Sequence, residues 1–218
     1  MEIDNSLITT IGENGGLDIL AELGEITLDS IIDNDAINQI PIIGTLKGIY
    51  KITNSISDQL FVQKILKFLL ELDTLTDDEK VEMKFKIDNT KNNKIGETLL
   101  EIINKIDDAN KPKIIAQIFK SYINAEIDFH EFKKFSQIVN KSYLPDLMKL
   151  TEFFRGQPIT NENSSALLSM GLIKISEKEY TGEVSLKSMA ERQIFEYKLN
   201  DAGKKLLYIL YPDFQIIR

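Results

Sequence analysis

Apolar residues recur every three or four positions along most of this chain, which is the spacing that places them on one face of an α-helix. These runs predict helices at 17–33, 42–57, 58–72, 94–107 and 143–155, and helix-start signals at Thr76, Asn110 and Asp128 predict three more, at 76–88, 112–124 and 129–140. Pro41 interrupts the pattern between the first two runs, because proline cannot continue a helix. The first two thirds of the chain are therefore expected to be helical.

Several of these helices begin at residues whose side chains can cap the free backbone N–H groups of the first turn. Two of the starts have the spacing of a capping box, in which an acid three residues further on bonds back to the first residue. The expected caps are, in chain order, Asp58, Thr76 with Glu79, Asn110, Asp128 with Glu131, and Ser142.

The hydrophobic pattern changes after Gly156. A short helix is expected from Thr160 or Asn161 to Met170. Gly171 follows it as the predicted C-cap, a position that requires the left-handed conformation and that glycine adopts at little cost.

The remaining residues predict a hairpin and one more helix. Residues 172–176 read as a strand, residues 193–199 alternate as a strand does, and the polar residues 177–191 separate them. Asn200 is the expected cap of a last helix, 201–211. The predicted fold class is mainly α, a multi-helix domain followed by a unit that carries a short two-stranded hairpin.

Two stretches of this last region carry a resemblance. Residues 167–173 read Leu-Leu-Ser-Met-Gly-Leu-Ile, and residues 197–206 read Tyr-Lys-Leu-Asn-Asp-Ala-Gly-Lys-Lys-Leu. They resemble bacterial winged-helix domains, in which a helix ends in Gly-Leu-Ile, a hairpin wing follows, and a Leu-Thr-x-x-Gly-like turn opens the final helix. The resemblance covers about a third of the chain and implies a winged unit over 142–211.

Winged-helix domains read DNA with the helix that precedes the wing. In this chain that helix, 160–170, contains no Lys or Arg, although Asn161, Asn163 and Ser165 have side chains that can contact bases. Without cations there is no anchor for the phosphates. A structural or protein-docking role for the unit is therefore expected, and DNA binding is the alternative.

Two further resemblances concern the helical region and the whole layout. Residues 112–135 are similar to bacterial TerB-type helical domains in their acidic turn, 125–131, but lack the Asp-Gly pair of that family. The overall layout is similar to that of uncharacterised bacterial proteins encoded near phage-defence genes. The expected domains are a mobile lead-in at 1–16, which ends in Gly-Glu-Asn-Gly-Gly, a helical domain at 17–140, and a winged-helix-like domain at 141–218.

The distribution of charge argues against a nucleic-acid binder. The net charge is −8, and residues 1–46 contain nine acids and no Lys or Arg. The rest of the chain is close to neutral, so no segment supplies the basic surface that neutralises phosphates.

The residue types present exclude several kinds of chemistry. There is no Cys and a single His, His130, so disulfides, thiolate sites and sites with two His ligands are impossible. The one candidate metal site is the group Glu126, Asp128, His130 and Glu131, but a capping box beside a surface histidine explains these residues more simply. No metal, cofactor or enzymatic activity is expected.

Residues 40–72 hold the longest apolar region, and Gly44 and Gly48 in it have the four-residue spacing that lets helix backbones approach closely. Three interpretations compete: a buried helical hairpin, a surface for self-association or a protein partner, and a membrane-active hairpin. Lysines interrupt the stretch, which argues against the last. The expected interaction residues are Ile43, Gly44, Leu46, Gly48, Ile49 and Tyr50.

The start of the chain lacks the basic and apolar parts of a signal peptide, and no apolar run reaches the roughly 18 residues of a membrane span. A cytoplasmic protein is therefore expected. The function predicted from the sequence is that of a non-enzymatic bacterial interaction protein, in phage defence or a mobile element, that binds another protein or itself. A membrane-acting toxin and a winged-helix DNA-binding regulator are the alternatives.

Overall fold

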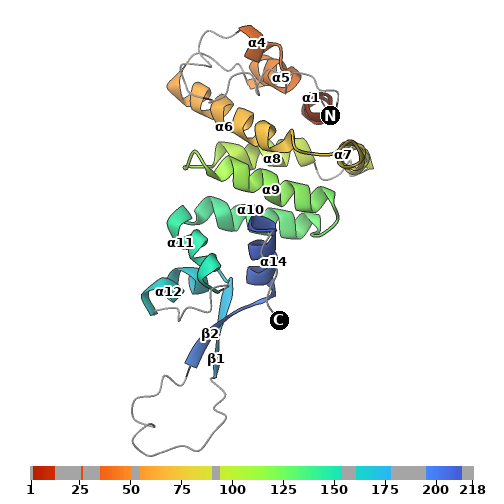
Figure 1. Cartoon of the computed structure of the whole chain (residues 1–218). Coiled ribbons are helices and arrows are strands. Elements are labelled where there is room, and N and C mark those ends of the chain that lie inside the picture. Colours follow the sequence, from red (N-terminus) through yellow and green to blue (C-terminus); the bar gives the residue numbers. More distant parts are fainter. Residues whose placement is uncertain are drawn as a thin grey trace, which may run out of the picture. The chain divides into compact units, whose positions relative to one another are not determined.

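The computed structural model describes residues 2–12, 26, 35–50, 55–89, 94–153, 161–177 and 195–212. The chain divides into two compact units, residues 1–140 and 141–218. The described residues are mostly helical, and the strands among them form one two-stranded antiparallel sheet near the C-terminus (Figure 1). The predicted fold class is confirmed.

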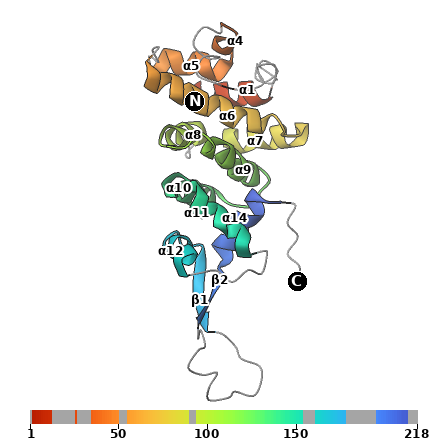
Figure 2. The same ribbon diagram turned by 60° about the vertical axis from the view of Figure 1, so that its left-hand side comes forward.

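The first unit is built from helices alone in its described part. They are α1 (Glu2–Gly12), α4 (Asp35–Asn38), α5 (Pro41–Tyr50), α6 (Ile56–Leu72), α7 (Asp77–Asn89), α8 (Ile95–Asn104), α9 (Lys111–Ile123) and α10 (Phe129–Lys141), whose last residue already belongs to the second unit. Helix α1 packs on α5, α7 and α8, and helix α6 packs on α8 and α9. In both views α6 lies between α5 and the pair α8 and α9 (Figures 1 and 2).

Helix α1 lies where the sequence predicted a lead-in. Ile3, Leu7 and Ile11 are four residues apart and all are buried, so one face of α1 belongs to the core. The glycines that follow suggested a loop, yet the helix extends to Gly12. The predicted helix 17–33 falls outside the described residues except for Ile26, whose carbonyl accepts a 2.9 Å hydrogen bond from Gln63 Nε2 on α6.

An aromatic cluster holds α6, α9 and α10 together. The ring of Phe119 on α9 lies 6.0 Å from Phe68 on α6, 6.1 Å from Tyr122 and 5.8 Å from Phe132 on α10, measured between centroids. Phe68, Phe119 and Phe132 are buried, so each contributes area removed from water as well as ring contacts.

Lysine side chains donate hydrogen bonds to backbone carbonyls at the C-terminal ends of several helices in the first unit. The last carbonyls of a helix have no partner within it, and a cation at this end also interacts favourably with the helix dipole. Lys64 donates to the carbonyl of Ile106 at 2.5 Å, just beyond α8, and Lys86 donates to that of Tyr122 at 2.6 Å, near the end of α9. Burial lowers the pKa of both lysines.

Lys111 is the most buried of these lysines, with 1% of its surface exposed. Its ammonium donates to the carboxylate of Asp107 at 2.5 Å and to the carbonyl of Asn140, in the last turn of α10, at 3.1 Å. The hydrogen bond from Lys111 lowers the pKa of the Asp107 carboxyl. A buried charge is tolerated because it is paired in this way.

Both predicted capping boxes are confirmed. At the start of α7, Thr76 N donates to Glu79 Oε2 at 2.8 Å and Glu79 N donates to Thr76 Oγ1 at 3.3 Å. At the start of α10, Glu131 N donates to Asp128 Oδ1 at 2.7 Å and Asp128 N donates to Glu131 Oε2 at 3.2 Å.

The predicted helix start at Asn110 and Pro112 is confirmed, since Asn110 is the N-cap of α9 and Pro112 lies in its first turn, although the Asn110 side chain makes no cap bond. Two other predicted caps are wrong. Helix α6 begins two residues before Asp58 and is capped by Ser55, whose Oγ accepts from Asp58 N at 3.2 Å. The helix predicted after Ser142 begins with Tyr143 at its N-cap and is shorter than expected.

The turn between α9 and α10 contains the left-handed residue Ala125, with φ of 58°. Glu126 N donates to the carbonyl of Ser121 at 3.0 Å and Ala125 N donates to that of Tyr122 at 3.2 Å, which is the Schellman arrangement. Glycine is the usual residue at this position because a Cβ strains the left-handed backbone.

Replacing Ala125 by glycine is therefore expected to stabilise the protein by about 1 kcal/mol, since it removes that strain. Chemical denaturation measures the change. The matched control is Ala202→Gly within a helix of the second unit, where glycine is expected to cost about 1 kcal/mol. A loss of stability in Ala125→Gly would contradict the assigned turn.

The second unit contains α11 (Leu144–Met148), a 3₁₀ helix η1 (Lys149–Phe153), α12 (Asn161–Ser169), β1 (Ile173–Glu177), β2 (Phe195–Leu199) and α14 (Asp201–Leu210). The predicted helix 143–155 is thus a short α-helix continued by a 3₁₀ turn. The predicted strands and the last helix agree with the structure within two residues at each end. Gly171 has φ of 69° and is the C-cap that the sequence predicted.

Asn200 connects the two sequence stretches that suggested a winged helix. Its Nδ2 donates to the carbonyl of Gly171 at 2.8 Å, and its Oδ1 accepts from Gly203 N at 2.9 Å. Its backbone N donates to the carbonyl of Leu172 at 3.2 Å. One side chain therefore caps α14 and holds the start of that helix against the start of β1.

Candidate functional site

The region to which the sequence assigned the interaction residues is helix α5 and the start of α6. Pro41 is the first residue of α5, where its missing N–H costs nothing. The next N–H, of Ile42, donates to Thr10 Oγ1 of α1 at 3.0 Å, and that hydroxyl donates to the carbonyl of Ser6 at 2.7 Å. Thr10 is buried and thereby fixes α5 against α1.

The structure divides the six predicted interaction residues into two sets. Ile43 and Leu46 lie in the core with no exposed surface, so they hold α5 in place and cannot contact a partner. Gly44, Gly48 and Ile49 are exposed. The side chain of Tyr50 lies outside the described residues.

The two glycines do not mark a tight helix crossing among the described residues. A Cβ built on Gly48 meets no atom within 4 Å, and one on Gly44 meets only the carbonyl of Asn38 at 3.7 Å, which is ordinary contact. Helix α5 has its main contacts with α1, and α6 has its main contacts with α9. The spacing of the glycines leaves a bare strip on the outer side of α5 rather than a seam between α5 and α6.

The close approach occurs at Gly96 instead, in the first turn of α8. A Cβ there would lie 2.8 Å from Asp4 Oδ1, 3.1 Å from Ile3 Cγ2 and 3.3 Å from Asp4 Cα. Glycine lets α1 approach closely enough for Asp4 Oδ1 to accept a 2.7 Å hydrogen bond from Gly96 N. An isolated glycine near the start of the predicted helix 94–107 was the available signal in the sequence.

Substitution by alanine is expected to have opposite effects at Gly96 and at Gly48. Gly96→Ala is expected to cost about 1–3 kcal/mol, because the new methyl group displaces α1. Gly48→Ala is expected to stabilise by about 0.5–1 kcal/mol, because alanine is the better helix former and has open space. Denaturant melts of both variants measure this. Equal effects of the two would contradict the assigned packing.

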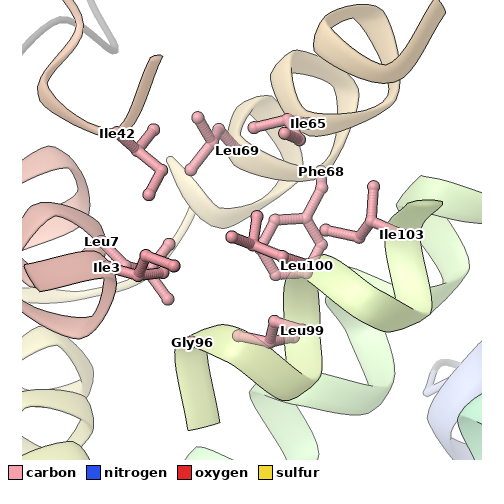
Figure 3. A pocket seen from close by; sticks show the side chains of 10 residues that line it. All are labelled: Ile3, Leu7, Ile42, Ile65, Phe68, Leu69, Gly96, Leu99, Leu100 and Ile103. Carbon is pink, nitrogen blue, oxygen red and sulfur yellow. The ribbon is translucent and has the colours of Figure 1, made fainter. Parts of the chain in front are cut away.

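A cavity of about 10 Å³ lies beside Gly96, between α1, α5, α6 and α8 (Figure 3). Apart from Gly96, aliphatic and aromatic side chains line it: Ile3, Leu7, Ile42, Ile65, Phe68, Leu69, Leu99, Leu100 and Ile103. A buried water needs polar partners, and this lining offers no polar side chain. The cavity is a packing gap and not a site for a polar ligand.

Three exposed apolar side chains flank the connection between α5 and α6. Ile49 is 43% exposed at the end of α5, Ile56 is 72% exposed at the start of α6, and Leu60 one turn later is 39% exposed. Together with Gly44 and Gly48 they are called the α5–α6 surface below. The sequence predicted Ile56 within the helix 42–57, whereas it begins α6 after the Ser55 cap and is exposed.

The acidic group around His130 forms a helix start. Asp128 and Glu131 bond to each other's backbone N–H groups, as described above, and Glu126 and His130 are exposed. Among the described residues, no three His, Asp or Glu side chains are grouped so that they can hold a metal ion.

None of the helices in the described ranges is both long and apolar enough to cross a membrane. Comparison of the chain with protein-family profiles, with curated proteins and with solved structures finds no match in any of the three.

Proposed function

We propose that this protein is a non-enzymatic binding protein that associates with itself or with another protein through the α5–α6 surface. The observation that carries the proposal is the exposure of Ile49, Ile56 and Leu60 on either side of one helix connection. Several exposed apolar side chains in one region of a surface are the usual mark of an interaction site, whereas single ones are common on any surface.

The construction of this region supports the proposal. Ile42, Ile43 and Leu46 anchor α5 in the core, and Thr10 fixes its first turn. The outer side of α5 is bare at Gly44 and Gly48, so a partner backbone can approach it without meeting side chains. Exposed apolar side chains on a helix that is anchored in the core favour association, because little freedom is lost on binding.

The same construction disfavours the membrane-acting alternative. Most apolar side chains of residues 42–72 would have to leave the core before they reached lipid. Lys64 and Lys67 of this stretch donate to backbone carbonyls of Ile106 and Ala109, at 2.5 and 3.3 Å, and these bonds would be lost as well. The DNA-binding alternative lacks cations on α12.

Size-exclusion chromatography with light scattering tests the self-associating form of the proposal. The wild-type protein is expected to be larger than its 24.9 kDa monomer, and Ile56→Lys is expected to shift it to the monomer without loss of helicity. Val81→Lys, at an equally exposed residue of α7, is the control and should leave the mass unchanged. A wild-type monomer at every concentration would exclude self-association through this surface.

A further inference from the structure

The hairpin of the second unit has an edge whose backbone groups can be assigned from its register. Ile173 pairs with Leu199, Lys174 with Lys198 and Ile175 with Tyr197. Asn200 N donates to the carbonyl of Leu172, so Leu172 and Asn200, which precede and follow these strands, form a hydrogen-bonded pair. Because bonded and non-bonded pairs alternate in an antiparallel ladder, the backbone groups of Lys174 and Ser176 point toward β2.

It follows that the N–H and C=O groups of Ile173, Ile175 and Glu177 point away from β2, along the outer edge of β1. Within the described part of the chain the two strands pair only with each other. Such an edge is a template for another strand unless it is covered or blocked.

The two faces of the hairpin differ in chemistry. One face carries Ile175 and Phe195, which are 52% and 53% exposed, beside the buried Ile173, and Glu177 lies at its end opposite Phe195. The other face carries Lys174 and Lys198 directly opposite each other. Lys198 forms an ion pair with Glu196 at 2.5 Å, while Lys174 is exposed and has no carboxylate partner among the described residues.

We propose that the outer edge of β1 binds an extended segment of a partner protein in which apolar and acidic side chains alternate. The backbone of the segment pairs with Ile175 and Glu177, the exposed residues of this edge. Its apolar side chains then lie beside Ile175, and its acidic side chains lie on the opposite face beside Lys174, because side chains alternate across a strand. The site is separate from the α5–α6 surface and does not depend on it.

A pair of peptides of equal composition tests the proposal with the full-length protein. In one peptide Val and Glu alternate, and in the other the same residues form a Val block and a Glu block. Isothermal titration calorimetry is expected to detect the alternating peptide and to show at least roughly tenfold weaker binding of the block peptide, a difference of about 1.4 kcal/mol. Equal binding of the two, or no binding of either, would overturn the proposal.

Ile175→Pro tests the pairing of the backbone. The N–H of Ile175 points away from β2, so proline at this position removes the outward donor and leaves the hydrogen bonds between β1 and β2 intact. The variant is expected to retain its melting temperature and to bind the alternating peptide at least roughly tenfold more weakly, the equivalent of about 1.4 kcal/mol. Ile175→Thr keeps the donor and is the matched control for the lost side chain. If the proline variant retained both its fold and wild-type affinity, the assigned edge would be wrong.

Lys174→Glu tests the charge independently of any effect of proline on folding. It is expected to weaken binding of the Val-Glu peptide and to confer binding of a peptide in which Val and Lys alternate. Failure of that exchange would contradict the assigned faces. A duplex DNA fragment is tested as a competitor of the peptide. If the DNA competes, and if its binding is abolished by Lys174→Glu but not by Ile175→Pro, the surface binds a nucleic acid and the proposal is overturned.

Discussion

Gly203→Ala is expected to destabilise the second unit by about 3 kcal/mol or more, at the upper end of the range for overpacked sites. A Cβ at Gly203 would lie 2.0 Å from the carbonyl oxygen of Leu172 and 3.1 Å from Leu199 Cδ2. The first of these atoms belongs to the backbone at the start of β1, so relief requires α14 to move as a whole. That movement would also break the cap bonds of Asn200.

Differential scanning calorimetry of Gly203→Ala, with Lys204→Ala as the control, measures this effect. Lys204 is exposed on the same turn and its truncation leaves the backbone contact intact, so its effect should stay within about 0.5 kcal/mol. Similar melting curves for the two variants would mean that α14 does not pack on Leu172 as described.

Phe119→Ala is expected to cost about 3–5 kcal/mol, as is usual for removing a buried phenylalanine. Phe119 is central in the aromatic cluster, with rings from α6, α9 and α10 within 6.1 Å of its own. Its removal leaves a cavity that three helices would have to close together. The free energy of unfolding, taken from urea titrations of the wild type and the variant, gives the size of the effect.

Phe85→Ala is the control for that experiment, because Phe85 is the same residue type on the outer side of α7 and is mostly exposed. It is expected to change stability by no more than about 0.5 kcal/mol. A cost below about 1 kcal/mol for Phe119→Ala would show that the cluster is not the centre of the core.

Local patterns in the sequence predicted most of the described elements. The helices α6 and α8 and the two strands follow from apolar spacing, whereas α7 and α10 follow from capping boxes, at Thr76 and Asp128, of two residues three positions apart. Helix α9 follows from the start signal of Asn110 and Pro112. Each of these signals lies within a few residues of the structure that it predicts. For the same reason the sequence alone predicts the roles of Gly171 and Asn200 at their helix ends.

Long-range contacts could not be predicted in the same way. Asp4 caps α8 across 92 residues, and Lys64 reaches a carbonyl 42 residues away. Nothing near these residues in the sequence indicates their partners. Helix α1 was missed for a different reason, since the glycines after it suggested a loop although Ile3, Leu7 and Ile11 have helical spacing.

The candidate interaction site was predicted only in part. The sequence assigned the interaction residues to one apolar helix, but a run of apolar residues does not show which of them face the core. Ile43 and Leu46 are buried, whereas Ile49 remains exposed and is joined by Ile56 and Leu60 of the next helix. The Ser55 cap, which fixes where α6 begins, decides that Ile56 points outward.

Site-specific photo-crosslinking in living cells tests the proposed function most directly, because it detects a second copy and a different partner protein alike. A photoreactive residue replaces Ile56 on the α5–α6 surface in one variant and Val81 on α7 in the other, both highly exposed positions. Defined adducts from position 56 and none from position 81 are the predicted result. Absence of adducts at position 56, or the same adducts at both positions, would contradict the assignment of the α5–α6 surface as the binding site.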